Sequence, residues 1–325
     1  MFNKLISMHN KKYMLIGVSL LRICFGLILL YFYLIHYGQR YFLWGPNGMI
    51  EHKDFLKYIS INYKLSIFNF SSSVLYFDLI FHLGIVFAIL FTIGYKGRIV
   101  SVINFIFVWS IFSRNGIILD GGDNIMRIIL VYLMFADTTA YFSVDRKLMD
   151  KKCIKPVHIR DNIRISFYIH NMAILACIVQ VCMVYITSGF HKAMGELWQE
   201  GVAIYYILQV GEYTHPLIEN LITNSDAIMV LGSYSTVLVQ IAFPFLLFNR
   251  ITKYIAMAGI ITMHIGIAIG MGLVSFSAVM ISIQLLMLTD FEYQKIRNKL
   301  FKVKQYVKSC IPKKKNDQKS FHLRP

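Results

Sequence analysis

The sequence is short of acidic residues, proline and cysteine, and these shortages exclude several classes of protein. Only 17 of its 325 residues are Asp or Glu, against 33 Lys and Arg, and charged residues make up 15% of the chain. Six prolines leave long apolar runs almost uninterrupted. Hydrophobic residues reach 57%, and the mean hydropathy is +0.57. A soluble domain of this length is rarely so apolar, so the composition predicts a polytopic membrane protein.

The five cysteines do not form the pattern of a disulfide framework. Cys24, Cys177 and Cys182 lie in apolar runs, whereas Cys153 and Cys310 lie in basic segments. Neither Cys177 nor Cys182 has His or acidic neighbours at the spacing of metal ligands, and we expect no metal site. The chain also has no internal repeat and no GxGxxG, Walker, HExxH or GxSxG motif, which excludes the chemistry that those motifs carry.

Apolar runs along the chain are long enough to cross a membrane. The first, residues 13–37, exceeds the roughly 20 residues that a helix needs, and no small-residue cleavage pattern follows it, so it is predicted to be a retained span. Residues 252–271 and 273–290 are predicted to form a hairpin, because one helix of their combined length would overshoot the bilayer about twofold. We therefore predict an all-α polytopic bundle of about eight transmembrane helices, at residues 13–37, 74–94, 98–113, 124–142, 166–189, 226–248, 252–271 and 273–290.

Basic residues predict the orientation of these spans. An even number of spans places both termini on one side, and the connections on that side are rich in Lys and Arg. The connection 190–226, on the other side, has only Lys192 against five acidic residues. Only the longer segment 38–73, which reads as an amphipathic surface segment, departs from the rule. The predicted domains are a cytoplasmic N-terminus (1–12), a transmembrane bundle (13–290) and a basic cytoplasmic tail (291–325).

The tail carries eleven of the 33 basic residues, between Lys295 and Arg324. Such a tail after the last span usually touches anionic lipid headgroups on the cytoplasmic side, although a merely solvated tail is an equal alternative. Membrane lipids therefore account for the high pI, and nucleic-acid binding is not predicted.

The most polar stretch within the apolar part of the chain runs from Ser113 to Arg127. It contains Arg114, Asp120 and Asp123 as well as Arg127, and such groups near a bilayer are costly unless they are paired or face water. We expect these residues to line a pocket on the external side; a hydrated turn is the alternative. Asp123 and Arg127 are four residues apart, the spacing at which helical side chains meet, so an ion pair is expected there.

Further polar residues stand in or beside apolar runs. His191 and Lys192 lie where a span meets the external connection, and desolvation there favours the neutral amine that a general base needs. The alternative is a snorkelling lysine with Trp198 as an interfacial anchor. His264 lies in an apolar helix and is expected to be packed and hydrogen-bonded. Arg22 lies deep in the first span and should find a carboxylate or carbonyl partner, as a structural clamp or as part of a site.

Three motifs, in this order, resemble the horizontally transferred transmembrane domain family. They are RNGIILDGGDNIMRIILVYLMFADTTAYFSVD (114–145), YITSGFHKAMGELWQEGVAI (185–204) and MHIGIAIGMGLVSF (263–276). That family includes the membrane part of vitamin K-dependent gamma-glutamyl carboxylase and the bacterial sporulation-delaying protein B group. The resemblance extends from about Arg22 to Asp290, and the length and bare architecture are most similar to the sporulation-delaying group.

The resemblance to the carboxylase implies that Lys192 is a base that deprotonates a hydroquinone. It also implies that His264 corresponds to a histidine of the family's transmembrane core, so that a quinone or hydroquinone is a possible cofactor. The chain ends shortly after its predicted eighth span, without the carboxylase's large soluble domain. We therefore expect Lys192 and His264 to be catalytic, and we keep quinone chemistry as an alternative.

The resemblance to the sporulation-delaying group implies a multi-pass protein of the bacterial plasma membrane that is required to mature a secreted antimicrobial peptide toxin. Its partners would be the secreted precursor and a soluble or peripheral maturation protein. One alternative is a carboxylase-like enzyme with Lys192 as base, and another is a non-enzymatic immunity or scaffold protein that binds the toxin. An intrinsic protease is not favoured, because no serine stands in a nucleophile motif with a placed base.

Overall fold

Long helices form the body of the molecule in the computed structural model, which describes residues 10–151, 161–211 and 214–310. Within these residues the secondary structure is helical apart from one isolated bridge between Asn47 and Glu51. This confirms the predicted all-α, polytopic membrane bundle. Its long apolar helices are α2 (Leu15–Ile35), α5 (Val74–Ile93), α6 (Gly97–Arg114), α9 (Asp161–Ala193), α13 (Asp226–Leu246) and α14 (Arg250–Met271).

The bundle has fewer full-length spans than the eight that the sequence predicts. Six helices in the described ranges are long and apolar enough to cross a membrane. A seventh span counts only if 274–287 and 290–305 are taken together despite a bend of 101°. The prediction of eight full-length spans is therefore wrong. The two remaining runs form shorter helices, α7 (Gly121–Leu133) and α15 (Val274–Ile283), the latter continued by the 3-10 helix η3 (Gln284–Met287).

The short helices nevertheless connect the same two ends of the bundle as the long ones. α7 begins where Gly122 packs against Phe276, in the first turn of α15. α15 and η3 then lead to Leu285, whose carbonyl oxygen faces Gly17 in the first turn of α2. The chain after α7 forms turns and reaches the buried Arg22. These turns also contain apolar residues, so the predicted span 124–142 extends beyond the end of α7.

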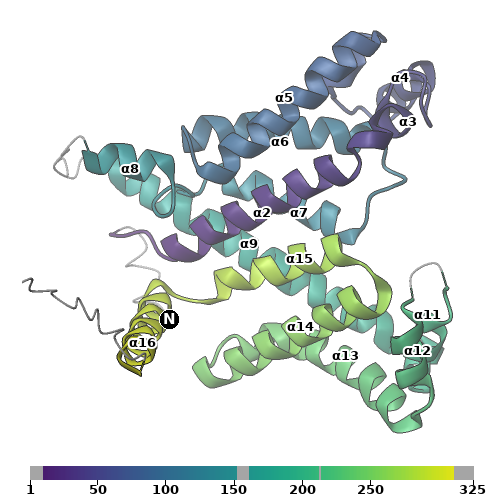
Figure 1. Ribbon diagram of the computed structural model, residues 1–325, viewed down its shortest axis with the longest axis vertical. Coiled ribbons are helices and arrows are strands. Elements are labelled where there is room, and N and C mark those ends of the chain that lie inside the picture. Colours follow the sequence, from purple (N-terminus) through teal and green to yellow (C-terminus); the bar gives the residue numbers. More distant parts are fainter. Residues whose placement is uncertain (1–9, 152–160, 212–213, 311–325) are drawn as a thin grey trace, which may run out of the picture.

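We name the two ends of the bundle after Arg22 and Lys192. In Figure 1 the Arg22 end lies at the left, with α8 and α16, and the Lys192 end lies at the right, with α3, α4, α11 and α12. The helices outside the spans are α8 (Val144–Lys151) and α16 (Asp290–Cys310) at the Arg22 end; at the Lys192 end they are η1 (Tyr37–Gln39), α3 (Arg40–Trp44), α4 (His52–Ile61), η2 (Ile67–Asn69), α10 (Glu196–Gln199), α11 (Ala203–Leu208) and α12 (Pro216–Thr223).

Asp290 joins the beginning of the first span to the beginning of α16. Its carboxylate accepts hydrogen bonds from the backbone amides of Leu15 (3.2 Å) and Ile16 (2.8 Å), which are unpaired donors in the first turn of α2. The described chain therefore enters and leaves the bundle at the Arg22 end. The cytoplasmic location of the termini stays a prediction, and residues 1–9 and 311–325 lie outside the described residues.

Aromatic packing forms the interior, while large apolar side chains also cover the exterior. The buried Phe81 ring lies 5.2 Å from Tyr33, 6.0 Å from Trp44 and 5.9 Å from Phe77, centroid to centroid. Helices that are apolar all round are expected where lipid replaces water as the solvent. The outward-facing side chains that fit this include Leu27, Leu79, Val86, Ile106 and Leu238.

Arg22 ties three segments together at its end of the bundle. Its side chain is 1% exposed and donates hydrogen bonds only to backbone carbonyl oxygens in the described structure. Two belong to the last turn of α5, where helical carbonyls lack intrahelical partners. The buried charge is thus met directly by carbonyl dipoles, and in the described residues Arg22 forms no ion pair at contact distance. The acceptors are Phe91 (2.9 Å), Thr92 (2.6 Å), Thr138 (3.0 Å) and Phe142 (2.8 Å).

Candidate functional site

Lys192 and Trp198 come together at the end of α9. Lys192 occupies the last turn of this helix, and its Nζ donates to Ser188 Oγ at 2.7 Å, one turn earlier. The chain turns sharply after α9, so the Trp198 ring lies 5.5 Å beneath the ammonium group. His191, by contrast, is exposed and does not share this environment. In the described structure no carboxylate forms an ion pair with Lys192.

His264 is buried where α9, α14 and η3 meet. Its Nε2 lies 3.3 Å from the hydroxyl of Tyr185, and Gln284 Nε2 donates to the same hydroxyl at 3.2 Å. Because an amide nitrogen can only donate, the Tyr185 oxygen accepts from Gln284 and its own proton is free for His264 Nε2. In the tautomer whose Nε2 accepts this proton, Nδ1 carries the proton of the neutral imidazole. Lys192 lies close enough to His264 to act on it electrostatically.

Several buried polar atoms around His264 have no hydrogen-bond partner among the described residues. His264 Nδ1 and Gln284 Oε1 are two of them, and the side chains are each 2% exposed. Gln240 Oε1 and Ser277 Oγ are two more; Gln240 contacts the residue before His264 through a 3.6 Å bond to the Met263 sulfur. An unpaired buried polar atom costs about 1–3 kcal/mol. We call Tyr185, Gln240, His264, Ser277 and Gln284 the polar core; its unpaired atoms are of the kind that usually bind water or a ligand when buried.

Phe276 links the polar core to the start of α7. Its ring centroid lies 5.3 Å from that of His264. On the other side, a Cβ on Gly122 would stand 2.8 Å from the Phe276 Cα, closer than real Cβ contacts allow. Glycine at this position therefore lets the starts of α7 and α15 touch. Phe276 therefore contacts both Gly122, in the polar stretch from Ser113 to Arg127, and His264.

Asp120 and Asp123 begin α7 by capping each other. Asp120 Oδ1 accepts from the Asp123 amide at 3.0 Å, and Asp123 Oδ2 accepts from the Asp120 amide at 3.2 Å. The expected ion pair between Asp123 and Arg127 is wrong: no such pair occurs in the part of the chain that the structure describes. Arg127 donates to Asn124 Oδ1 at 2.7 Å and lies over the Trp109 ring at 5.0 Å. The capping box turns the Asp123 carboxylate back toward the helix start, away from the next turn.

Arg114 belongs to a different part of the Lys192 end. Its side chain is 2% exposed, and its Nη2 donates to the carbonyl oxygens of Gly45 and Ile50, both at 2.7 Å. The guanidinium also lies 4.7 Å from the centroid of Phe55. Arg114 thus anchors the segment between α3 and α4. The predicted site residues fall into two groups: Lys192, Trp198, His264 and the Asp120 turn form one, and Arg114 and Arg127 contact other segments.

Sequence reasoning did not identify the partners of His264 in the polar core. Tyr185, Gln240 and Gln284 are single polar residues within apolar runs, as in TVLVQIAF and ISIQLLM. Such residues in a membrane span usually face the bundle interior, and this signal could have found them. Which of them meet, however, depends on how α9, α13, α14 and α15 pack.

Comparison with known proteins gives one distant relative. The chain is 26% identical over 217 residues to the uncharacterized protein YitO of Bacillus subtilis (strain 168). The alignment covers 63% of this chain and 64% of the relative, so the chain spans less than two thirds of that protein's length. No family model matches the chain, and no solved structure matches it.

Proposed function

We propose that this protein is a multi-pass component of the bacterial plasma membrane that matures a secreted antimicrobial peptide, acting on the precursor at its Lys192 end. The observation that carries the proposal is the meeting of three motifs. Residues 114–145, 185–204 and 263–276, which resemble the horizontally transferred transmembrane domain family, are far apart in sequence and converge on Phe276, Tyr185 and His264.

The distribution of charge supports an outward-facing Lys192 end. Basic residues of the α5–α6 turn, of α8 and of α16 gather at the Arg22 end, which the positive-inside rule assigns to the cytoplasm. A secreted precursor would then meet the Lys192 end. Lys192 would contact the precursor, and the Trp198 ring would hold the lysine in place.

Deleting the gene and analysing the culture medium by mass spectrometry tests this proposal. The mature peptide should disappear while its precursor accumulates, and the wild-type gene supplied in trans should restore it. If the deletion strain still releases the mature peptide at the wild-type level, the proposal is wrong. Loss of self-protection with normal processing would instead favour an immunity protein that binds the toxin.

The polar core favours a second candidate, a carboxylase-like enzyme that uses a hydroquinone. The unpaired atoms there match the hydroxyl groups of such a molecule in chemical type: Gln284 Oε1 and Gln240 Oε1 can accept, and His264 Nδ1 can donate when it carries the ring proton. When bound, a hydroquinone would supply reducing equivalents, and Lys192 would hold the proton taken from it.

Lys192 variants separate a base from a simple positive charge. Lys192→Ala and Lys192→Arg should both abolish activity if the amine accepts a proton, because a guanidinium does not deprotonate in proteins. Activity retained in Lys192→Arg would exclude the base mechanism. Protein levels in the membrane fraction, compared with those of His191→Ala at the exposed neighbouring position, control for folding.

A further inference from the structure

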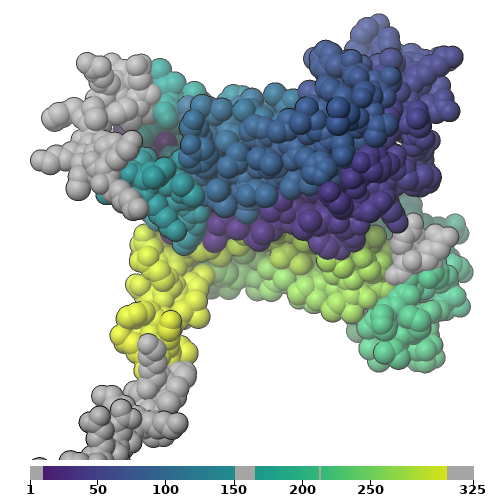
Figure 2. Space-filling model, turned by 45° about the horizontal axis from the view of Figure 1, so that its top comes forward, coloured from purple at the N-terminus to yellow at the C-terminus, as the bar shows by residue number. Residues whose placement is uncertain are grey.

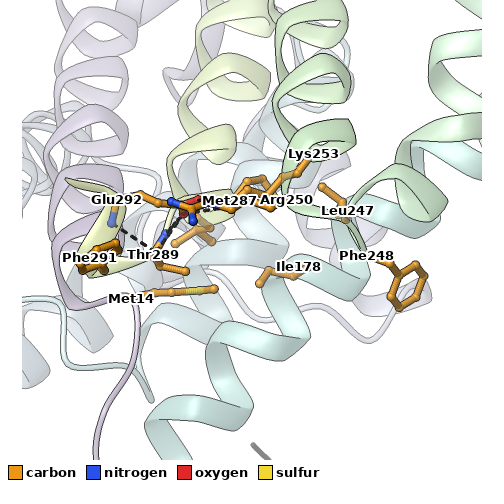
Figure 3. A pocket seen from close by; sticks show the side chains of 11 residues that line it. Met14, Ile178, Leu247, Phe248, Arg250, Lys253, Met287, Thr289, Phe291 and Glu292 are labelled. Carbon is orange, nitrogen blue, oxygen red and sulfur yellow. Dashed lines mark hydrogen bonds and ion pairs between the residues drawn. The ribbon is translucent and has the colours of Figure 1, made fainter. Parts of the chain in front are cut away.

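A cavity of about 440 Å³ opens at the Arg22 end, remote from Lys192. Figure 3 shows it between the end of α13, the start of α14, the middle of α9 and the η3–α16 connection. Its wall is mostly apolar, whereas Arg250, Lys253, Thr289 and Glu292 provide the polar groups. The apolar lining residues are Met14, Ile178, Leu247, Phe248, Leu286, Met287 and Phe291.

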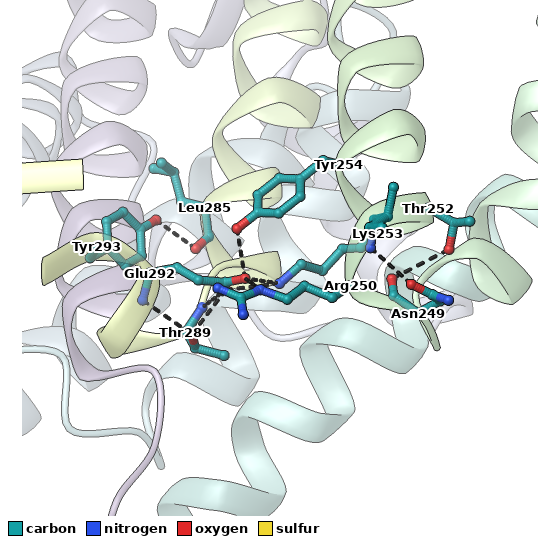
Figure 4. A network of polar contacts seen from close by, with 10 residues as sticks. Asn249, Arg250, Thr252, Lys253, Tyr254, Leu285, Thr289, Glu292 and Tyr293 are labelled. Atoms are coloured by element: carbon teal, nitrogen blue, oxygen red, sulfur yellow. Dashed lines mark hydrogen bonds and ion pairs between the residues drawn. The ribbon is translucent and has the colours of Figure 1, made fainter. Parts of the chain in front are cut away.

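Glu292 is saturated by hydrogen bonds that do not involve Arg250. Its carboxylate accepts from Lys253 Nζ at 2.8 and 2.9 Å and from the Tyr254 hydroxyl at 2.7 Å. The amide and hydroxyl of Thr289 add bonds of 2.8 and 2.9 Å. Figure 4 shows these donors converging on one side chain. Of the two cations paired with Glu292, Lys253 is therefore the close one, at 2.8 Å, and Arg250 the distant one, at 3.7 Å.

Arg250 is consequently a cation with spare donors at the mouth of the cavity. Its Nε lies 3.7 Å from Glu292, beyond hydrogen-bond distance, and its side chain is 59% exposed. Asp290, whose carboxylate accepts from the two amides at the start of α2, does not line the cavity. Among the residues that line the cavity, two cations, Arg250 and Lys253, face the one carboxylate of Glu292, so the mouth carries one more positive than negative charge beside an apolar wall.

α16 extends from the mouth of the cavity in the orientation expected of a helix that lies parallel to the membrane surface. The bend of 101° after η3 sends it across the bundle axis, and Figure 2 shows it, in yellow, projecting from the bundle. Ile296, Leu300 and Val303 follow the helical spacing of one face and are 43%, 64% and 59% exposed. Basic residues flank this stripe on both sides, the pattern of a helix that lies on anionic lipid. They are Lys295, Lys299 and Lys302 on one side and Arg297 and Lys304 on the other.

We propose that the cavity is a binding site for one anionic phospholipid. An acyl chain lies along the apolar wall, and Arg250 binds the headgroup phosphate. α16 rests on the neighbouring lipids of the same leaflet and keeps the mouth of the cavity at headgroup depth. A lipid fits better than a free anion, because the charged mouth and the apolar wall are continuous.

Native mass spectrometry of the full-length protein in detergent tests this site. Palmitoyl-oleoyl phosphatidylglycerol should give one retained adduct, bound about ten-fold or more tightly than phosphatidylcholine with the same acyl chains, as one charge-assisted hydrogen-bonding site allows. Arg250→Gln should remove this preference. Ile178→Trp, which fills the cavity, should weaken binding of both lipids. Lys57→Gln, an exposed lysine of α4 at the opposite end, is the matched control and should bind as the wild type does.

Two outcomes would overturn the proposal. If Arg250→Gln and Ile178→Trp both retain the adduct while neutralising the lysines of α16 removes it, lipid binds the helix surface and not the cavity. If inorganic phosphate displaces phosphatidylglycerol at equal concentration, the site recognises a free anion. Thermal unfolding of each variant shows whether it is folded. Because Arg250 is exposed, Arg250→Gln should fold and still test the site if Ile178→Trp does not fold.

Discussion

The Tyr185 hydroxyl lies 3.3 Å from Nε2 of His264 and joins α9 to α14 inside the bundle. Gln284 donates to the same hydroxyl from η3, so one oxygen connects three elements of the candidate site. Four buried polar atoms of the polar core, one of them on His264, have no hydrogen-bond partner among the described residues.

Removing the Tyr185 hydroxyl should therefore affect stability and function together. Tyr185→Phe leaves His264 Nε2 and the Gln284 amide without their shared partner, and we expect the free energy of unfolding in detergent to fall by about 1–3 kcal/mol. Tyr206→Phe, at an exposed tyrosine of α11, should change it by less than about 0.5 kcal/mol. Equal stability of the two variants would show that the hydroxyl contributes no net hydrogen bond.

The close approach of α7 and α15 predicts a marked effect at Gly122. Gly122→Ala places a methyl group against the Phe276 backbone, and we expect it to destabilise the protein by about 1–3 kcal/mol through overpacking. Gly116→Ala is the matched control, because a Cβ there meets no atom within 4 Å. Thermal unfolding in detergent measures both, and a neutral Gly122→Ala would contradict the described contact.

Loss of the Arg22 clamp should be more costly. Arg22→Met removes the hydrogen bonds to four backbone carbonyl oxygens, and we expect a loss of about 3 kcal/mol or more. Arg98→Met, at an exposed arginine of the same end, should have little effect. The amount of folded protein recovered after size-exclusion chromatography reports the difference. Equal recovery of the two variants would exclude the clamp.

Glu292 should make stability depend on pH in the acidic range. Burial alone would raise the pKa of its carboxyl, but hydrogen bonds from Lys253, Thr289 and Tyr254 lower the pKa to about 2, below the ordinary 4.5. Because the pKa in the folded state lies below the ordinary value, Glu292 contributes its full stabilisation above pH 4.5. That stabilisation is lost as the pH falls from 4.5 toward 2. Unfolding curves across this range should show that loss. Glu292→Gln should flatten it, whereas Glu200→Gln, at an exposed carboxylate, should not.

The orientation of the bundle can be tested by cysteine labelling. In a variant with the five native cysteines replaced, Glu196→Cys should react with an impermeant maleimide on intact cells, whereas Lys147→Cys should react only after permeabilisation. Both positions are exposed, so accessibility in the folded protein does not bias the comparison. The reverse labelling pattern would place the Lys192 end in the cytoplasm and rule out action on a secreted precursor.

The sequence by itself determined the features that depend on residues close together in the chain. Apolar runs of sufficient length specified the long helices, because a backbone in lipid must satisfy its own hydrogen bonds. Asp120 and Asp123, three residues apart, specified the start of α7. The need of Arg22 for a partner was also visible, since a charge within a span cannot remain unpaired.

Only the tertiary structure decided which distant groups meet. The carbonyl partners of Arg22 lie 69 to 120 residues away, and Tyr185 is separated from His264 by 79 residues and from Gln284 by 99. Helical periodicity defines a face of each helix but not the neighbour that the face meets. The wrong pair of Asp123 with Arg127 has a mainly local cause: the capping box with Asp120 engages the Asp123 carboxylate, and Arg127 donates to Asn124 and lies over the Trp109 ring.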